Sequence, residues 1–79
     1  MKRLEIQPEG WPCLLIECRP GYFVYRDALC FKSEYRNQRG HLEAFCESGE
    51  QFWGGAKSDR DREVLAVQPV TAVWVEVEP

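Results

Sequence analysis

The chain alternates between apolar and polar residues over several short stretches, a pattern that predicts β-strands. The clearest are residues 29–36 and 41–47, which the polar stretch 37–40 joins in the manner of a β-hairpin. Residues 70–78 alternate as well and predict a strand at the end of the chain. We expect these strands to form an antiparallel sheet with one face toward a core.

Shorter apolar stretches predict the remaining strands. Residues 4–6, 22–25 and 64–67 have the composition of strands, and residues 51–53 form a short strand or a bend. The apolar stretch 11–18 is either a strand or a single helical turn, because periodicity does not separate the two at this length.

The charge-dense stretch 56–63 interrupts this pattern. Ser58 or Asp59 could cap one helical turn there, and the alternative is a solvated loop. Five or six short strands separated by turn residues predict an all-β fold, a small SH3-like antiparallel β-barrel with one short helical turn. A curved antiparallel sheet with one short helix packed on it is the alternative.

Length and charge limit the function. A chain of 79 residues predicts one small domain spanning residues 1–79. No stretch approaches the roughly 18 apolar residues of a membrane span, and the start lacks the apolar segment of a signal peptide, so we expect a cytoplasmic protein. A net charge of −3 argues against a general nucleic-acid binder.

The four cysteines are Cys13, Cys18, Cys30 and Cys46. Without a secretory signal we expect a reducing cytosol and four free thiols, with Cys30 and Cys46 packed as small core residues. The spacing contains no Cys-x-x-Cys pair, so a zinc site made from the cysteines, with His41 in place of one of them, is the weaker alternative. We expect no cofactor.

The chain carries no pattern typical of an active site. Its single histidine, His41, lies beside the predicted hairpin turn, where a surface position is the ordinary expectation. The carboxylates form no concentrated cluster, and no phosphate-binding loop, serine-hydrolase or zinc-protease motif is present. We therefore expect a protein that acts by binding and not by catalysis.

Trp74 is the strongest candidate for contact with a partner. It lies on the opposite face of the last predicted strand from the valines of that strand, so it is exposed if the valines face the core. Exposed tryptophans within a polar rim are typical of protein interfaces. The predicted partner-binding residues are Trp74, Glu76, Glu78, Tyr35 and Arg36. Covering a barrel end or making a homodimer contact is the alternative role of Trp74.

The charges suggest a surface with two sides. Glu76 and Glu78 make the end of the chain acidic, whereas Arg26, Lys32, Arg36 and Arg39 place basic residues around the central hairpin. An acidic face that carries an aromatic residue suits a basic groove on a partner. Ordinary solubility explains the same charges.

A second set of residues predicts an alternative ligand site. The residues of this set are Arg36, Trp53, Gly54, Gly55 and Lys57. The glycine pair could present backbone N–H groups to the phosphate of an anionic nucleotide. Such a site requires an oligomer, because a filled small barrel has room for a ligand only at a subunit interface. A structural turn that lets Trp53 fold back is the other interpretation.

Four segments carry a resemblance to known proteins. They are Pro-Gly-Tyr-Phe at 20–23, Phe-Lys-Ser-Glu-Tyr at 31–35, Ser-Gly-Glu-Gln-Phe-Trp-Gly-Gly at 48–55 and Val-Gln-Pro-Val at 67–70. Together they resemble small uncharacterised proteins encoded by tailed phages and prophages. The resemblance covers residues 4–74 and implies a bacterial cytoplasm during infection or lysogeny. Small acidic phage proteins of this kind include inhibitors of host defence, such as anti-CRISPR proteins, and sponges for signalling nucleotides.

The expected function is therefore a non-catalytic phage protein that docks on a bacterial protein complex, as an inhibitor of host defence or an accessory factor. An oligomeric nucleotide sponge and a zinc-stabilised phage module are the alternatives.

Overall fold

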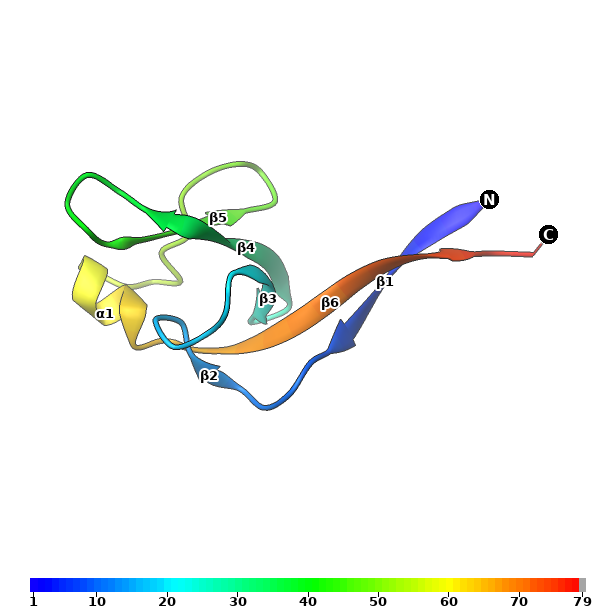
Figure 1. Cartoon of the computed structure of the whole chain (residues 1–79), viewed down its shortest axis with the longest axis horizontal. Helices are drawn as coiled ribbons and strands as arrows, with labels where there is room; N and C mark the ends of the chain where they lie inside the picture. The colour runs from blue at the N-terminus through cyan, green and yellow to red at the C-terminus, as the bar shows by residue number, and fades with distance from the viewer. Residues whose placement is uncertain (79) are drawn as a thin grey trace.

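The computed structural model describes residues 1–78 and contains six strands and one short helix (Figure 1). In chain order they are β1 (Lys2–Pro8), β2 (Cys13–Leu14), β3 (Gly21–Tyr25), β4 (Ala28–Arg36), β5 (Leu42–Cys46), α1 (Asp59–Glu63) and β6 (Ala66–Glu76). The strands form one antiparallel sheet in the order β1-β6-β3-β4-β5, and β2 pairs with β6 beside this path.

The molecule consists of a body, residues 13–69, and a two-stranded ribbon that projects from it, residues 2–8 and 70–76 (Figure 1). The strand β6 belongs to both, because its first half pairs with β2 and β3 and its second half pairs with β1 alone. The projection gives the molecule extents of 48 × 24 × 21 Å.

Pro69 marks the junction between body and ribbon. The sequence predicts two strands separated by a bend at this proline, but β6 runs through it without a break. The Pro69 carbonyl accepts a hydrogen bond from the Glu9 N–H at 2.9 Å. The nitrogen of Pro69 therefore points to the β1 side of β6, at a position just past Pro8, where β1 ends. The missing N–H of proline therefore falls where the β1–β6 pairing ends and disrupts little.

The main hydrophobic cluster lies in the body, and Val70, the first residue of the ribbon half of β6, is also buried. The buried residues of the cluster are Leu15, Cys18, Phe23, Cys30, Leu42, Ala44, Phe52 and Val67. The ring of Phe52 packs edge-to-face against those of Phe23 and Tyr25, with centroids 5.1 and 5.5 Å apart. The alternation predicted for the hairpin is confirmed, since Leu42 and Ala44 of β5 turn inward together with Cys30 of β4.

The all-β class is confirmed, whereas a closed barrel is not. Within residues 1–78, β1 and β5 end the strand order on opposite sides and do not pair, so the sheet is open. The structure agrees better with the alternative, an antiparallel sheet with one short helix. The sheet stays open because β1 pairs with the far half of β6, and this pair of strands leads away from the body and from β5 (Figure 1).

The prediction of four free thiols is wrong for two of them. Cys13 and Cys18 form a disulfide, because the turn that follows β2 brings their Cα atoms to 6.0 Å. Cys30 and Cys46 are free, and Cys30 is buried as predicted. The disulfide removes Cys13 and Cys18 from the alternative set of zinc ligands, and the described residues contain no group of three or more metal-ligating side chains.

The helix α1 confirms the predicted helical turn. Ser58 is its N-cap, and its hydroxyl accepts a hydrogen bond from the Asp61 N–H at 3.1 Å. The stretch is not simply solvated, because Arg62 is fully buried against the sheet. No helix in the part of the chain that the structure describes is long and apolar enough to cross a membrane.

Candidate functional site

The ribbon carries an apolar face made of Leu4, Ile6, Ala72 and Trp74, which we call the ribbon face. Its members are cross-strand neighbours, since Leu4 pairs with Trp74 and Ile6 pairs with Ala72. Trp74 is 68% exposed, and Leu4 and Ile6 are 41% and 42% exposed. An apolar cluster that projects from the body is therefore open to solvent.

The exposure of Trp74 is confirmed, but the reason that the sequence suggested for it is wrong. The valines on the other face of the strand do not reach the core, because Val73 is exposed and Val75 is only half-buried. Beyond the buried Val70, both faces of this half of β6 lie outside the body. Strand alternation identifies which residues share a face, but it does not reveal that the strand has left the core.

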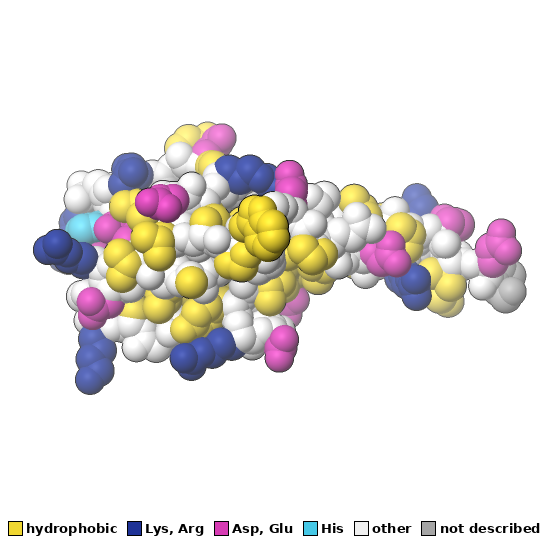
Figure 2. Space-filling model, turned by 90° about the horizontal axis from the view of Figure 1, so that it is seen from below, with side chains coloured by type: hydrophobic (Ala, Val, Ile, Leu, Met, Phe, Trp, Pro, Cys, Tyr) yellow, Lys and Arg dark blue, Asp and Glu magenta, His cyan; other side chains and the backbone are white. Residues whose placement is uncertain are grey.

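The acidic character predicted for the Trp74 surface is largely cancelled by β1. Lys2 lies opposite Glu76 in the strand register, and the amino group of Met1 is 3.5 Å from the Glu76 carboxylate. On the other face of the ribbon Arg3 pairs with Glu5 at 3.2 Å. Figure 2 shows hydrophobic and charged side chains of both signs along the ribbon. Glu78 lies exposed beyond the end of β6.

The structure separates the five residues of the predicted partner surface. Tyr35 and Arg36 end β4, at the opposite end of the molecule from the tip of the ribbon (Figure 1). The Arg36 guanidinium donates a hydrogen bond to the Gly40 carbonyl at 2.8 Å and so closes its own hairpin. Tyr35 is exposed. One compact partner surface therefore includes Trp74 and Glu76 but not the hairpin residues.

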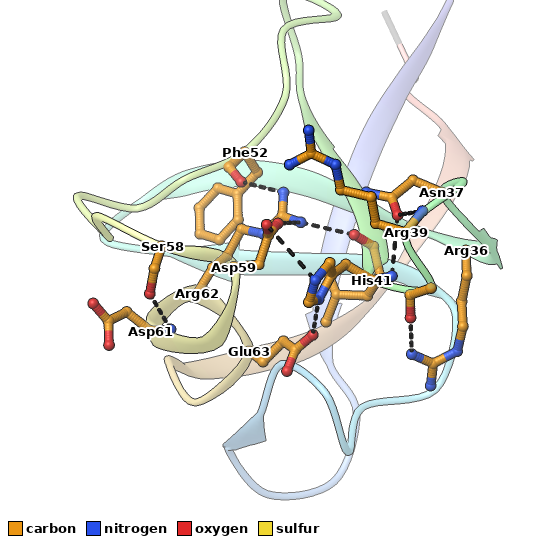
Figure 3. Close-up of polar contacts among 12 residues, drawn as sticks. Arg36, Asn37, Arg39, His41, Phe52, Ser58, Asp59, Asp61, Arg62 and Glu63 are labelled. Atoms are coloured by element: carbon orange, nitrogen blue, oxygen red, sulfur yellow. Dashed lines mark hydrogen bonds and ion pairs between the residues drawn. The ribbon is translucent and has the colours of Figure 1, made fainter.

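A polar cluster lies at the other end of the body, between α1 and the β4–β5 hairpin (Figure 3). His41 Nδ1 is 3.2 Å from Glu63 Oε1, and His41 Nε2 is 3.9 Å from Asp59 Oδ2. Asp59 Oδ1 accepts a hydrogen bond from Arg62 at 3.1 Å. His41 is therefore more than the surface residue predicted, because it links the hairpin to the helix.

Arg62 is the buried centre of this cluster, and the sequence analysis did not find it. Its guanidinium donates to the carbonyls of Leu42 at 2.8 Å and Phe52 at 3.1 Å, while its Nε atom is buried and has no hydrogen-bond partner among the described residues. The one available signal was its spacing of three residues from Asp59, which suits an ion pair on a helix. These contacts attach α1 to the sheet.

A hollow of about 520 Å³ opens beside the cluster. Its lining residues are Asn37, Gln38, Arg39, Glu43, Gln51, Trp53 and Asp59. The lining contains two carboxylates and one guanidinium, so it disfavours an anionic nucleotide. Trp53 is the one member of the predicted ligand site in this lining, because Arg36 and Lys57 lie outside it.

Gly54 belongs to a closely packed turn. Its φ of +58° lies in the left-handed region that favours glycine, and a Cβ there would lie 2.7 Å from atoms of Leu65 and Phe52. Its carbonyl accepts a hydrogen bond from the Tyr25 hydroxyl at 3.3 Å. Gly55 has φ +82° and open space around it. The structural interpretation of the glycine pair thus agrees with the observed packing.

Lys32 is a second buried cation that the sequence analysis placed on the surface. Its ammonium group donates hydrogen bonds to the carbonyls of Leu15 at 2.8 Å, Ile16 at 3.2 Å and Cys18. Burial lowers the pKa of Lys32, and the nearby charge of Arg36 lowers it further. Lys32 thus holds the disulfide loop on the sheet and adds nothing to a basic surface.

No protein-family model, curated protein or solved structure matches the chain.

Proposed function

We propose that the chain is a non-catalytic binding protein that docks on a bacterial protein complex through the ribbon face. The observation that carries this proposal is the exposure of Trp74 on a ribbon that projects from the body, beside the exposed Leu4 and Ile6. Tryptophan is the residue most enriched among those that dominate the energy of protein interfaces. No packing role within the described residues explains its position.

The shape of the ribbon favours a concave partner. Because it projects beyond the body, the ribbon can reach into a groove that the body cannot enter, and its apolar side chains would then lose their contact with water. Lys2 and Glu76 form the next cross-strand pair on the same face and flank the apolar cluster, so the rim of the partner groove is expected to be polar and of mixed charge.

The bacterial setting comes from the resemblance of residues 4–74 to small proteins of tailed phages and prophages. In that setting the complex bound is a component of host defence, and the chain acts as an inhibitor in the host cytoplasm. The docking role of the ribbon face does not depend on which complex is bound.

Capture from bacterial lysate on the immobilised full chain tests the proposal. We expect the wild-type protein and Trp11→Ala to enrich one and the same stoichiometric complex, and Trp74→Ala to lose it. Trp11 is the matched control, because it is 88% exposed but lies outside the ribbon. The purified complex should then bind Trp74→Ala at least about 30-fold more weakly, the effect of losing a dominant interface residue. Equal binding of both tryptophan variants contradicts the proposal.

A further inference from the structure

The outer edge of β1 is unpaired over the described part of the chain. β1 pairs with β6 on one side, and no described strand lies on its other side. An unpaired edge presents backbone N–H and C=O groups to which another strand can bond. We propose that this edge pairs with the same edge of a second copy of the chain, giving a four-stranded antiparallel sheet in the order β6-β1-β1-β6.

The backbone of β1 offers the correct groups for this pairing. The Met1 carbonyl accepts from the Val77 N–H at 2.8 Å, and the Glu9 N–H donates to the Pro69 carbonyl at 2.9 Å. Odd-numbered residues of this unbroken register therefore direct their backbone groups toward β6, and even-numbered residues direct theirs outward. Lys2, Leu4 and Ile6 present the free N–H and C=O groups.

One register uses all of these groups. With a two-fold axis through Leu4, Leu4 faces Leu4 of the second copy, and Lys2 faces Ile6 of the second copy. Each of these is a hydrogen-bonded pair, because both residues direct their backbone groups outward. Pro8 has no N–H to donate, but it lies beyond the paired region, so no hydrogen bond between the two copies is lost there.

The same register also matches the charges. Arg3 faces Glu5 of the second copy, and Glu5 faces Arg3 of the second copy. These are non-hydrogen-bonded pairs, in which facing side chains approach most closely, and opposite charges there are stabilising. Arg3 and Glu5 already form an ion pair at 3.2 Å within one chain, so dimerisation builds a cluster of four alternating charges on one face of the sheet.

The apolar residues favour the same arrangement. Leu4 would lie against Leu4 of the second copy, with a Trp74 on each flank, because Trp74 is the cross-strand neighbour of Leu4. The two ribbon faces then form one continuous apolar stripe. An isolated two-stranded ribbon is only marginally stable in water. A four-stranded sheet with an apolar face is more stable, so pairing of the two copies would stabilise the ribbon.

The free edge of β6 is a poorer site for a second copy. Beyond its pairing with β3 at Pro69, the outer half of β6 contains a single charged residue, Glu76, and no basic residue. Two such edges offer no opposite charges to each other. The edge of β1 is the self-complementary one.

Sedimentation equilibrium of the full chain and of charge-reversed variants tests the dimer. We expect a wild-type monomer–dimer equilibrium. Arg3→Glu sets carboxylates against Glu5 of the second copy, and Glu5→Arg sets guanidinium groups against Arg3 of the second copy. Each change should raise the dimer dissociation constant by about tenfold or more, since two facing pairs become repulsive in each case. The double variant R3E/E5R should restore the wild-type value.

Mixing the two single variants separates pairing between chains from effects within one chain. An equimolar mixture of R3E and E5R sets acidic positions of one chain against basic positions of the other. We expect a heterodimer to form, as detected by native mass spectrometry, while each variant alone dissociates. Circular dichroism of each variant should match the wild type. A wild-type monomer at every concentration, or a mixture that stays monomeric, overturns the proposal, and neither result bears on whether Trp74 docks a bacterial partner.

Discussion

The guanidinium carbon of Arg62 lies 4.6 Å from the centre of the Trp53 ring, so a fully buried charge stacks on a side chain that reaches the surface. The same guanidinium donates to the carbonyls of Phe52 and Leu42 and to the carboxylate of Asp59. A cation–π contact and charge-assisted hydrogen bonds are strong where water is excluded. Arg62 therefore joins the helix α1 to β5 and to the segment that precedes the helix.

Replacing Arg62 should destabilise the body strongly. Arg62→Met removes the guanidinium that donates to the carbonyls of Leu42 and Phe52 and to the carboxylate of Asp59. We expect the free energy of unfolding in urea to fall by about 3 kcal/mol or more. Arg60→Met is the matched control on the exposed face of the same helix and should change it by less than about 0.5 kcal/mol. Similar effects of the two substitutions would contradict the account of Arg62.

The glycine pair allows a test of the structural turn. Gly54→Ala and Gly55→Ala both place a Cβ at positive φ, which costs about 1 kcal/mol, but only at Gly54 does that Cβ meet Leu65 and Phe52 at 2.7 Å. We expect Gly54→Ala to lower the melting temperature clearly more than Gly55→Ala. If the two variants melt together, Gly54 does not pack as described.

The free thiols should differ in reactivity. Burial, with a smaller contribution from the neighbouring Cys46, raises the pKa of the Cys30 thiol to about 11. At pH 8 iodoacetamide should therefore modify the half-buried Cys46 and spare Cys30, as read by peptide mass spectrometry. Rapid modification of Cys30 at pH 8 would contradict its burial.

The raised pKa of Cys30 also predicts the sign of a pH dependence. Between the ordinary value of 9.0 and about 11, the unfolded chain has lost the thiol proton while the folded chain keeps it. The contribution of Cys30 to the free energy of unfolding is thus complete below pH 9 and falls as the pH rises through 11. The difference between wild type and Cys30→Ala should shrink over this range.

The disulfide loop should survive reduction. Closing a loop of this length contributes about 2 kcal/mol, and the Lys32 hydrogen bonds to Leu15 and Ile16 remain after the bond is broken. We expect a reductant to lower the unfolding free energy by about that amount without unfolding the protein. Cys13→Ser/Cys18→Ser should not respond to the reductant. Complete unfolding on reduction would make a fold in a reducing cytosol untenable.

The sequence predicts the strands of the body well, because there local alternation and burial agree. The stretches 29–36 and 41–47 correspond closely to β4 and β5, and Ser58 caps the short helix as expected. In each case the residues that decide the structure are neighbours in the chain. Short-range patterns are sufficient to specify such elements.

The features that the sequence analysis missed all depend on contacts between distant segments. The carbonyls that bind Lys32 belong to a turn 14–17 residues earlier in the chain, and the ribbon exists only because β1 pairs with the far half of β6. A charged residue in an alternating strand is expected to face water, unless another segment supplies its hydrogen-bond partners. The distance between Trp74 and Tyr35 also depends on such a contact, because the pairing of β1 with β6 carries Trp74 away from the body.

The central claim is that the ribbon, and not the polar hollow, contacts the partner. The three tryptophans report on separate surfaces, since Trp74 lies on the ribbon, Trp53 lines the hollow and Trp11 precedes β2. Fluorine NMR of the 5-fluorotryptophan-labelled protein, with and without bacterial lysate at a fixed protein concentration, measures all three at once. We predict that the Trp74 resonance shifts or broadens while the other two stay unchanged. An unchanged Trp74 resonance, or a response of Trp53 alone, would contradict the account.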